Sequence, residues 1–355
     1  MSNRQDIKIS IEYGAGGRKM HRLISELFLK YFDNAILKKL EDAAEISLGT
    51  NNNKFCYTID SYVVQPLFFS GGDIGKLAVC GTVNDLAVKG AKPLYIALSF
   101  VITEGLSLRT LEKICQSIAQ ATRSLNILIV TGDTKVIEHK HSKTQDNSEI
   151  ANEEIIITTC GIGEILSAFS NPTLNVNNIT VGDQVIINGY IGEHEAAVIL
   201  ARKDYHFTGK IKSDCAALYP LIELLAKNRC QIKMMRDPTR GGIATTLNEI
   251  ANATDFSIVL DENKLPIPKA VRGLAELLGV DPLYMANEGK VIIIADRKET
   301  PKIVKIMKTH PLGKNATIIG EVTEKYHDLG VWLKTRIGGL RPLLQLEGSQ
   351  LPRIC

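Results

Sequence analysis

The run Ile127-Leu128-Ile129-Val130-Thr131-Gly132-Asp133 places four consecutive apolar residues before a polar turn. Such a run predicts a buried strand, which here would end at Asp133. The residues before it, 108–125, predict a helix, and residues 154–163 predict another strand. Helix and strand patterns alternate along the rest of the chain, with several short strands. This order predicts an α/β, or layered α+β, protein.

Two domains and a short tail account for the 355 residues. Further strands are predicted at 7–11, 55–59, 184–188, 257–260, 290–295 and 317–322. Further helices are predicted at 20–32, 74–88, 195–202, 214–227, 243–252, 269–278 and 300–308. The stretch 171–183 indicates a boundary between an N-terminal domain at 1–170 and a C-terminal domain at 171–339. Residues 340–355 are rich in glycine, proline and polar residues, and we expect a flexible tail there.

The overall composition excludes several kinds of partner. Lys and Arg number 42 against 39 Asp and Glu, and this net charge of +3 gives no electrostatic case for binding nucleic acid or an anionic membrane. The sequence lacks the ~20 continuous apolar residues of a membrane-spanning helix, and its N-terminus lacks the apolar core of a signal peptide. The 7 cysteines form no Cys-x-x-Cys pair and lie mostly in apolar runs. We expect buried, reduced thiols in a cytoplasmic protein.

The turn Gly14-Ala15-Gly16-Gly17 lies between a predicted strand and a predicted helix. The backbone N–H groups of Gly16 and Gly17 would favour a phosphate group, although a tight turn that needs positive φ explains the same glycines. A second segment, 70–77, has Lys76 in the place of the Walker A lysine. It lacks the first glycine and the metal-binding Ser/Thr of that loop, so any nucleotide site must be of another type.

Three aspartates end or interrupt apolar segments of the N-terminal half: Asp60, Asp85 and Asp133. Carboxylates that share a site repel each other, and Mg²⁺ with phosphate oxygens is the usual way to relieve that repulsion. Each aspartate taken alone is also explained as a cap or turn residue. Lys135 lies just beyond Asp133, where it could clamp a phosphate or transfer a proton.

The C-terminal half supplies two further candidates. The segment Arg236-Asp237-Pro238-Thr239-Arg240-Gly241-Gly242 predicts either an anion-receptive turn or a helix start capped by Asp237. Glu288 precedes a predicted strand in an apolar region, where a buried glutamate is unusual unless it is paired or functional. In the polar loop predicted at 138–149, His139 and His141 are poor candidates for metal ligands.

The chain ends in Pro352-Arg353-Ile354-Cys355. At ~3.3 Å per extended residue, the segment from Leu340 to Cys355 would span roughly 50 Å. A frayed end and a thiol that is delivered to a distant site explain this ending equally well.

A set of short motifs occurs in order over essentially the whole chain. The motifs are Asp60-Ser61-Tyr62, Gly71-Gly72-Asp73-Ile74-Gly75-Lys76, Asn84-Asp85, Gly132-Asp133-Thr134-Lys135, Arg236-Asp237-Pro238-Thr239-Arg240-Gly241-Gly242, Ala286-Asn287-Glu288-Gly289, His310-Pro311-Leu312-Gly313 and Pro352-Arg353-Ile354-Cys355. This set resembles the HypE family of hydrogenase maturation factors. It is also similar to the wider superfamily of aminoimidazole ribonucleotide synthetase, selenophosphate synthetase and thiamine monophosphate kinase. The resemblance implies a two-domain α/β fold whose N-terminal sheets pair into a barrel across a homodimer.

The resemblance also implies an activity. A partner carbamoyltransferase would place a carbamoyl group on Cys355, and the enzyme would then phosphorylate the carboxamide oxygen with ATP and eliminate phosphate. The product would be a thiocyanate, from which cyanide passes through a maturation scaffold complex to the iron of a nickel–iron hydrogenase precursor. Such a phosphoryl transfer needs positioning, Mg²⁺ and charge neutralisation rather than a protein nucleophile.

The roles that follow from the resemblance can be assigned residue by residue. Asp60, Asp85 and Asp133 would hold Mg²⁺, and Lys135 or Glu288 would take the amide protons. The residues expected to contact the nucleotide are Gly16, Gly17, Asp60, Lys76, Asn84, Asp85, Asp133 and Asp237.

The sequence departs from the family's pattern at two places. Tyr13 precedes the glycine turn where His is usual, and Gly192-Glu193-His194-Glu195 stands in place of Gly-Asp-His-Gly. Two other interpretations are a superfamily kinase or synthetase that acts on a free small molecule and a non-enzymatic scaffold that presents Cys355. The cysteine-terminated tail weakens the first, and the acidic residues weaken the second.

Overall fold

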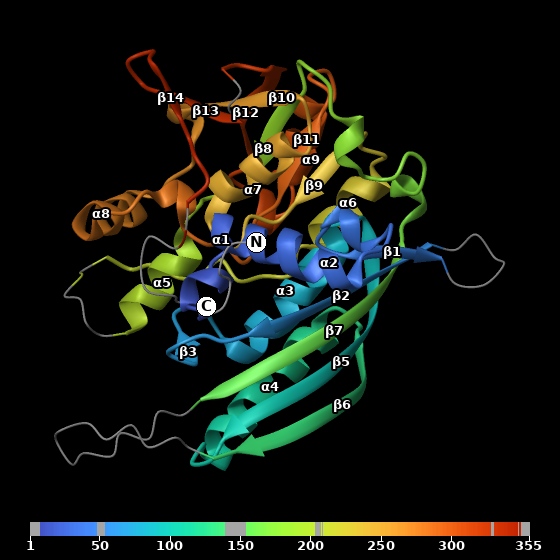
Figure 1. Cartoon of the computed structure of the whole chain (residues 1–355), viewed down its shortest axis with the longest axis vertical. Helices are drawn as coiled ribbons and strands as arrows, with labels where there is room; N and C mark the ends of the chain where they lie inside the picture. The colour runs from blue at the N-terminus through green and yellow to red at the C-terminus, as the bar shows by residue number, and fades with distance from the viewer. Residues whose placement is uncertain are drawn as a thin grey trace, which may run out of the picture.

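The chain folds into two layered α/β domains that contact each other along helix α3 (Ile74–Val88) (Figure 1). The structure is a computed structural model that describes residues 8–47, 54–138, 154–202, 207, 209–327, 330–346 and 348. The predicted two-domain α/β class is confirmed. Cys355, His139 and His141 lie outside the described residues. Within the described ranges, each helix is too short or too polar to cross a bilayer.

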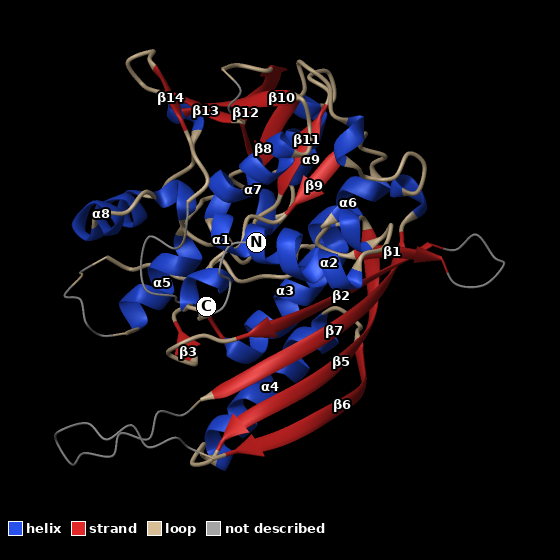
Figure 2. Cartoon of the chain, viewed as in Figure 1, coloured by secondary structure: helices blue, strands red, loops and turns tan. Residues whose placement is uncertain are grey.

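The N-terminal domain is built on a five-stranded sheet with the order β1-β2-β7-β5-β6. Its strands are β1 (Ala44–Ser47), β2 (Lys54–Tyr62), β5 (Ala91–Thr103), β6 (Leu128–Ile137) and β7 (Ile155–Ile165). Strands β5 and β6 are parallel, and the other neighbours are antiparallel. Helices α3 and α4 (Leu108–Ser124) cover one side of this sheet (Figure 2).

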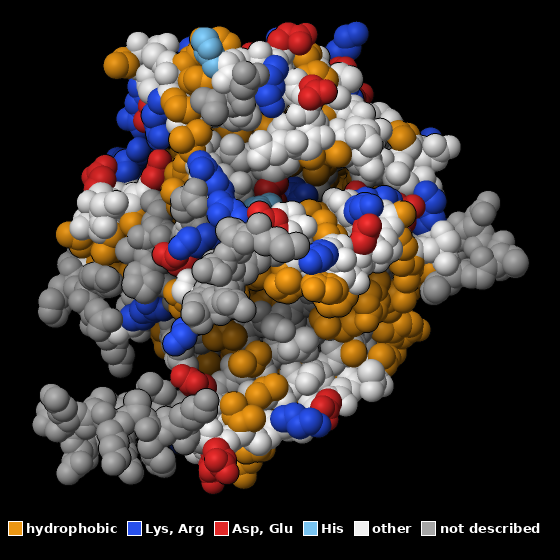
Figure 3. Space-filling model, viewed as in Figure 1, with side chains coloured by type: hydrophobic (Ala, Val, Ile, Leu, Met, Phe, Trp, Pro, Cys, Tyr) orange, Lys and Arg blue, Asp and Glu red, His pale blue; other side chains and the backbone are white. Residues whose placement is uncertain are grey.

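The other side of the five-stranded sheet is apolar and exposed. Tyr57, Ile59 and Tyr95 are 45%, 61% and 45% exposed, and Figure 3 shows apolar side chains gathered over the strands of this sheet. The N-terminal helices α1 (Arg18–Leu23) and α2 (Leu29–Phe32), joined by the π-helical turn Ile24–Phe28, lie across the junction between the two domains (Figure 1).

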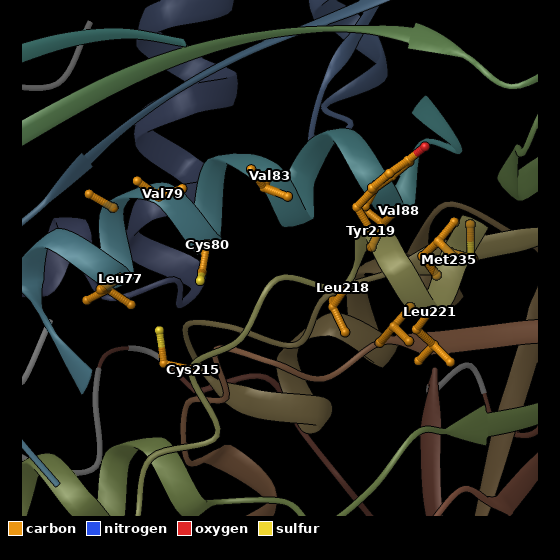
Figure 4. Packing of buried hydrophobic residues seen from close by; sticks show 14 of the residues in the cluster. Leu77, Val79, Cys80, Val83, Val88, Cys215, Leu218, Tyr219, Leu221 and Met235 are labelled. Atoms are coloured by element: carbon orange, nitrogen blue, oxygen red, sulfur yellow. The ribbon is translucent and has the colours of Figure 1, made fainter. Parts of the chain in front are cut away.

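Helix α3 is buried on nearly all sides, as its almost continuous apolar sequence requires. One side packs against β2 and β7, and the other faces α6 (Tyr219–Lys227) and β9 (Met234–Arg236) of the C-terminal domain. In Figure 4, Cys80 of this helix and Cys215 point toward each other, and Leu77 and Leu218 lie on either side of them. These four side chains belong to one buried cluster that spans both domains. The two domains therefore share a core, and their relative position is fixed by close packing.

The C-terminal domain is built on a seven-stranded sheet with the order β14-β13-β10-β12-β8-β11-β9. Its further strands are β8 (Gln184–Ile187), β10 (Phe256–Asp261), β11 (Ile292–Ala295), β12 (Thr317–Glu324), β13 (Val331–Lys334) and β14 (Leu340–Pro342). Its further helices are α5 (Glu193–Ala201), α7 (Gly242–Asn252), α8 (Lys269–Leu278) and α9 (Thr300–Met307). A short hairpin of β3 (Phe68–Phe69) and β4 (Gly72–Asp73) precedes α3.

Strand β5 has no counterpart among the predicted elements, although it lies between β7 and β6. Its sequence, Ala91 to Thr103, has no regular alternation because both of its faces are partly covered, and it contains Pro93. Three other predictions are wrong in detail. The described residues 8–10 form no strand, residues 214–218 precede α6 without being helical, and β6 runs past its expected end at Asp133 to Ile137.

The six described cysteines are free. Cys56, Cys80, Cys215 and Cys230 are buried, which confirms the expectation for most of the thiols, whereas Cys115 is exposed. Burial raises the pKa of the Cys56 thiol to about 12, so this group is a poor nucleophile at neutral pH.

The first residues of the predicted flexible tail are part of the fold. Leu340–Pro342 form β14, which pairs with β13, and Leu343 is fully buried. The Leu343 carbonyl accepts a hydrogen bond from Asn248 Nδ2 at 2.7 Å, and the Leu346 carbonyl accepts one from the Arg18 N–H at 3.0 Å. The apolar residues of this segment pack at a sheet edge, so the predicted flexible tail is wrong for residues 340–346. The nine steps from Leu346 to Cys355 would span at most about 30 Å, not 50 Å.

Candidate active site

An acidic pocket lies where the two domains meet. It is lined by residues of β2, of α3, of the segment after β9 and of the segment before β11. These residues are Asp60, Ser61, Tyr62, Val63, Leu77, Gly81, Asp85, Asp237, Thr239, Arg240 and Glu288. Four of the predicted site residues, from both halves of the chain, therefore come together here: Asp60, Asp85, Asp237 and Glu288.

Strand β2 supplies Asp60 and Tyr62, whose two-residue spacing puts both side chains on the face of the sheet that α3 covers. The Tyr62 hydroxyl lies 3.3 Å from Asp60 Oδ2 and 3.3 Å from Thr82 Oγ1. Gly81 of α3 makes room for the ring, because a Cβ at this position would lie 2.2 Å from the Tyr62 hydroxyl oxygen. Asp60 lies within β2 rather than after it, so the predicted position at a strand end is wrong.

Helix α3 carries Asp85 one turn after Gly81. Thr58 Oγ1 donates a hydrogen bond to Asp85 Oδ2 at 2.8 Å. Burial, followed by the charges of Asp237 and Asp60, raises the pKa of Asp85 well above its usual range. A carboxyl group in such surroundings gains stability from a cation.

The segment after β9 brings Asp237 and Arg240 to the same pocket. Burial and the charge of Asp42 raise the pKa of Asp237 well above its usual range. Arg240 also contacts the N-terminal glycine turn: Gly16 has φ +80, and a Cβ there would lie 3.1 Å from Arg240 Cβ. Gly17 is the N-cap residue of α1. The glycine turn therefore lies at the rim of the acidic pocket.

Glu288 is held in the pocket by its backbone. Its N–H donates to Asp214 Oδ1 at 3.2 Å, and its carbonyl accepts from Asn84 Nδ2 at 3.1 Å. Burial, followed by the charges of Asp237 and Asp214, raises the pKa of Glu288 well above its usual range. Asn84 also accepts a hydrogen bond from the Leu218 N–H at 2.8 Å, so its amide joins backbone segments of the C-terminal domain to α3.

The donor set of the pocket fits Mg²⁺. Four carboxyl groups and one guanidinium line it, and carboxylate oxygens are the ligands that Mg²⁺ prefers in proteins. The raised pKa values of Asp85, Asp237 and Glu288 reflect uncompensated repulsion and burial, which a divalent cation with a phosphate would relieve. Among the described residues, no group of three or more His, Cys, Asp or Glu is already arranged with metal-ligand geometry.

Asp133 does not reach this pocket within one chain. The strand register aligns Asp60 with Thr159, Thr159 with Leu98, and Leu98 with Gly132. Three strand spacings therefore separate Asp60 from Gly132, about 14 Å. Asp133, the next residue, points to the opposite face of the sheet, because side chains alternate along a strand. The three predicted metal ligands are thus not assembled by a single chain, since a metal site needs all ligands within a few ångströms.

Lys135 shares the exposed face with Asp133. Its Nζ lies 2.8 Å from Asp133 Oδ2, and the two side chains are 67% and 60% exposed. Lys76, another predicted nucleotide contact, lies outside the set of pocket-lining residues and donates to the Gly71 carbonyl at 3.0 Å. The remaining predicted catalytic residue, Cys355, lies outside the described residues.

Four polar residues of the pocket were not among the predicted site residues: Ser61, Tyr62, Thr239 and Arg240. Tyr62 follows Asp60 by two residues in a strand, so the period-two pattern was a usable signal. Arg240 stood in the predicted anion-receptive turn, but its position facing both the pocket and Gly16 depends on contacts between distant segments.

Two family models match most of the chain. Residues 40–165 match the N-terminal domain of AIR synthase related proteins, and residues 180–332 match the C-terminal domain of the same proteins. Residues 166–179 lie between the two matches.

Curated relatives match the chain over almost its whole length. The carbamoyl dehydratase HypE of Cupriavidus necator is 41% identical over 98% of this chain and 95% of its own length. The carbamoyl dehydratase HypE of Escherichia coli is 40% identical over 98% of this chain and 99% of its own length.

Solved structures have the same fold. A HypE–HypF complex includes a chain that is 42% identical, covering 91% of this chain and 99% of that one, with a TM-score of 0.81. A HypE in complex with ATP is 40% identical, covering 98% and 100%, with a TM-score of 0.77. A thiamine monophosphate kinase from Aquifex aeolicus, at 16% identity, coverage of 89% and 97% and a TM-score of 0.63, shares the fold alone.

Proposed function

This chain belongs to the HypE family of hydrogenase maturation factors, and we propose that it is an ATP-dependent carbamoyl dehydratase that acts on its own Cys355. It converts a carbamoyl group on the terminal thiol into a thiocyanate, which provides cyanide ligands for the iron of a nickel–iron hydrogenase. The observation that carries the proposal is the acidic pocket between the domains, in a chain about 40% identical over its length to carbamoyl dehydratases.

The reaction balances as a dehydration driven by ATP. The carboxamide oxygen attacks the γ-phosphorus of ATP, and ADP leaves. Two N–H protons are then removed while the C–O bond breaks, so that phosphate leaves and a carbon–nitrogen triple bond forms. The oxygen lost from the carbamoyl group ends in phosphate. An amide oxygen leaves only after phosphorylation, so the protein must position both reactants and neutralise charge.

Different residues of the pocket would perform different parts of this reaction. Asp60, Asp85 and Asp237 would hold Mg²⁺, which supplies charge neutralisation on the phosphates when bound. Arg240 offers a further positive charge beside Gly16, whose turn lies at the rim. Glu288 is suited to take the amide protons, because burial raises its pKa and a carboxylate with a raised pKa is a stronger base.

A homodimer explains the position of Asp133 and Lys135. Both lie on the exposed apolar face of the five-stranded sheet, where a charged pair is unusual. We propose that two such faces pack together and that Asp133 and Lys135 of one subunit complete the phosphate-binding site of the other. Lys135 then remains the alternative to Glu288 as the proton acceptor.

Two further partners belong to the proposal. A related HypE has been crystallised with HypF, and we propose that a carbamoyltransferase of this kind charges Cys355. A cyanide-accepting maturation scaffold complex would then receive the group from the thiocyanate.

Intact mass spectrometry tests the reaction. The full chain is incubated with its carbamoylating partner and then with Mg-ATP. We expect a carbamoyl adduct on the C-terminal peptide that becomes lighter by one water, and Cys355→Ala should form no adduct while still binding ATP. Thiocyanate formation on another residue of that variant would refute the carrier role of Cys355.

A further inference from the structure

The loop that carries Glu288 rests on a buried carboxylate that is not part of the pocket. Asp214 lies in the irregular segment before α6, and its side chain is only 2% exposed. Asp214 Oδ1 accepts the N–H of Glu288 at 3.2 Å, and Asp214 Oδ2 accepts the N–H of Gly289 at 3.2 Å. Lys290, the next residue after this pair, places its Nζ 2.9 Å from Asp214 Oδ2. One carboxylate therefore binds three groups of the same short loop.

The close approach of the two segments depends on glycine. A Cβ at Gly289 would lie 2.0 Å from the Asp214 carbonyl oxygen, so any larger residue would push the loop away from Asp214. The preceding part of the loop is anchored independently. Glu195 Oε2 accepts the Ala286 N–H at 2.7 Å, and Asn287 Nδ2 donates to the Pro238 carbonyl at 3.0 Å. Asp214 thus holds the half of the loop that bears the Glu288 side chain.

The ion pair keeps Asp214 charged. Burial opposes its ionisation, but Lys290 and His194 outweigh burial and lower the pKa of Asp214 below its usual range. An ionised carboxylate has acceptor capacity for both backbone N–H groups and for the ammonium group, and hydrogen bonds to a charged acceptor are the stronger kind. Glu193 Oε2 lies 3.8 Å from Lys290 Nζ as a second, more exposed acid.

We propose that Asp214, paired with Lys290, is a positioning residue for the dehydration, because it fixes the backbone from which the Glu288 carboxyl group enters the acidic pocket. This inference rests on the proposed role of Glu288 as the proton acceptor. Asn at position 214 would accept only one of the two N–H groups and would place an amide NH₂ against the other. A displacement of a reacting group by about 1 Å can cost roughly a hundredfold in rate.

The test uses the full chain, carbamoylated by its partner, in single turnovers with Mg-ATP. We expect Asp214→Asn to lower the rate of thiocyanate formation about 10- to 100-fold while the Kd for Mg-ATP changes less than about twofold. In a Glu288→Gln background, Asp214→Asn should cost no more than about twofold, because residues that act through one another are not additive. The matched control is Glu223→Gln, which removes an acid from the exposed pair with Lys227 and should leave the rate unchanged.

A second variant separates positioning from stability. In Asp214→Asn/Lys290→Met both charges of the pair are gone, so the folded state should regain stability while the rate remains low. Recovery of the rate together with the stability, full additivity with Glu288→Gln, or failure of the double variant to fold would each overturn the positioning role. An active Glu288→Gln enzyme would instead refute the proposed proton acceptor. The two failures are therefore distinguishable.

Discussion

Two Asp–Lys pairs in this chain have almost the same length and opposite surroundings. Lys290 Nζ lies 2.9 Å from Asp214 Oδ2, and the side chains are 9% and 2% exposed. Lys135 Nζ lies 2.8 Å from Asp133 Oδ2, and the side chains are 67% and 60% exposed. The distance alone therefore does not distinguish their roles.

Burial does distinguish them. The buried pair is committed to one geometry, since removing either charge leaves the other uncompensated in a low-dielectric interior. The exposed pair is weakened by water and salt, and each of its charges can exchange its present partner for another. The first pair suits a role in holding a loop, and the second suits a role in meeting another molecule.

The two Asp–Lys pairs should differ most in how much they contribute to the free energy of unfolding. Asp214→Asn should lower the free energy of unfolding by about 3 kcal/mol, because it strands the Lys290 charge with only a more distant acid nearby. Asp133→Asn should leave stability unchanged within error, because the remaining Lys135 charge is exposed to water. Urea denaturation of the two variants measures this difference, and equal losses would contradict the distinction.

Catalytic activity should also depend on the exposed pair, even though the stability of the fold does not. Asp133→Asn should reduce thiocyanate formation roughly 10- to 100-fold without changing stability, because the loss falls on charge stabilisation at the site of the other subunit. Mixing this variant with Asp85→Asn should restore about a quarter of the wild-type activity, since random dimers rebuild one intact site in half of the molecules. Mixtures that stay inactive would argue against a shared site.

Magnesium should distinguish the acidic pocket from both pairs. Burial raises the pKa values of Asp85, Asp237 and Glu288. Carboxyl groups with a raised folded-state pKa favour folding at pH below their unfolded values, and this contribution is lost as pH rises through the folded value. Mg²⁺ binds the ionised form, so it should raise the melting temperature by roughly 2–4 °C at pH 8 and by less at pH 5. Asp85→Asn should remove most of that gain, and NaCl at equal ionic strength is the control.

The smallest of the expected effects is that of salt on the pKa values of the two paired aspartates. A hydrogen bond from Lys135 lowers the pKa of Asp133, and this exposed interaction should weaken in 1 M NaCl, so the pKa moves back toward its usual range. The pKa of Asp214 should remain low under the same conditions, because its pair with Lys290 is buried. Carboxyl NMR titration of both aspartates measures the two values, and an equal response to salt would contradict the difference in burial.

The sequence was a good guide to elements with one regular pattern. Helix α8 was predicted at its observed bounds, because its apolar spacing and its flanking Pro268 and Gly279 are local signals. Strand β5 was missed because a central strand without alternation resembles no single template. Residues 214–218 were assigned to a helix, but this segment is irregular and contacts the Glu288 loop, and those contacts join residues far apart in sequence.

The residues of the candidate site were likewise predicted only in part. Asp60, Asp85 and Glu288 stood out as acids in or at the end of apolar segments, and Asp237 stood out as part of a predicted anion-receptive turn or helix cap. All four line the pocket. Asp133 stood out for the same reason but points to the opposite face of the sheet. A shift of one position along a strand reverses the face of a side chain, and a local pattern does not specify which neighbour covers which face.

The motifs and the alternation of helices and strands could be identified from the sequence alone, because they depend on residues a few positions apart. Only the tertiary structure decided that Glu288 meets Asp60 and Asp85, that Asp214 holds the Glu288 loop, and that Asp133 faces outward. These relations depend on strand register and on packing between the two domains. Both are set by the burial of apolar surface across the whole chain, which a local sequence pattern does not encode.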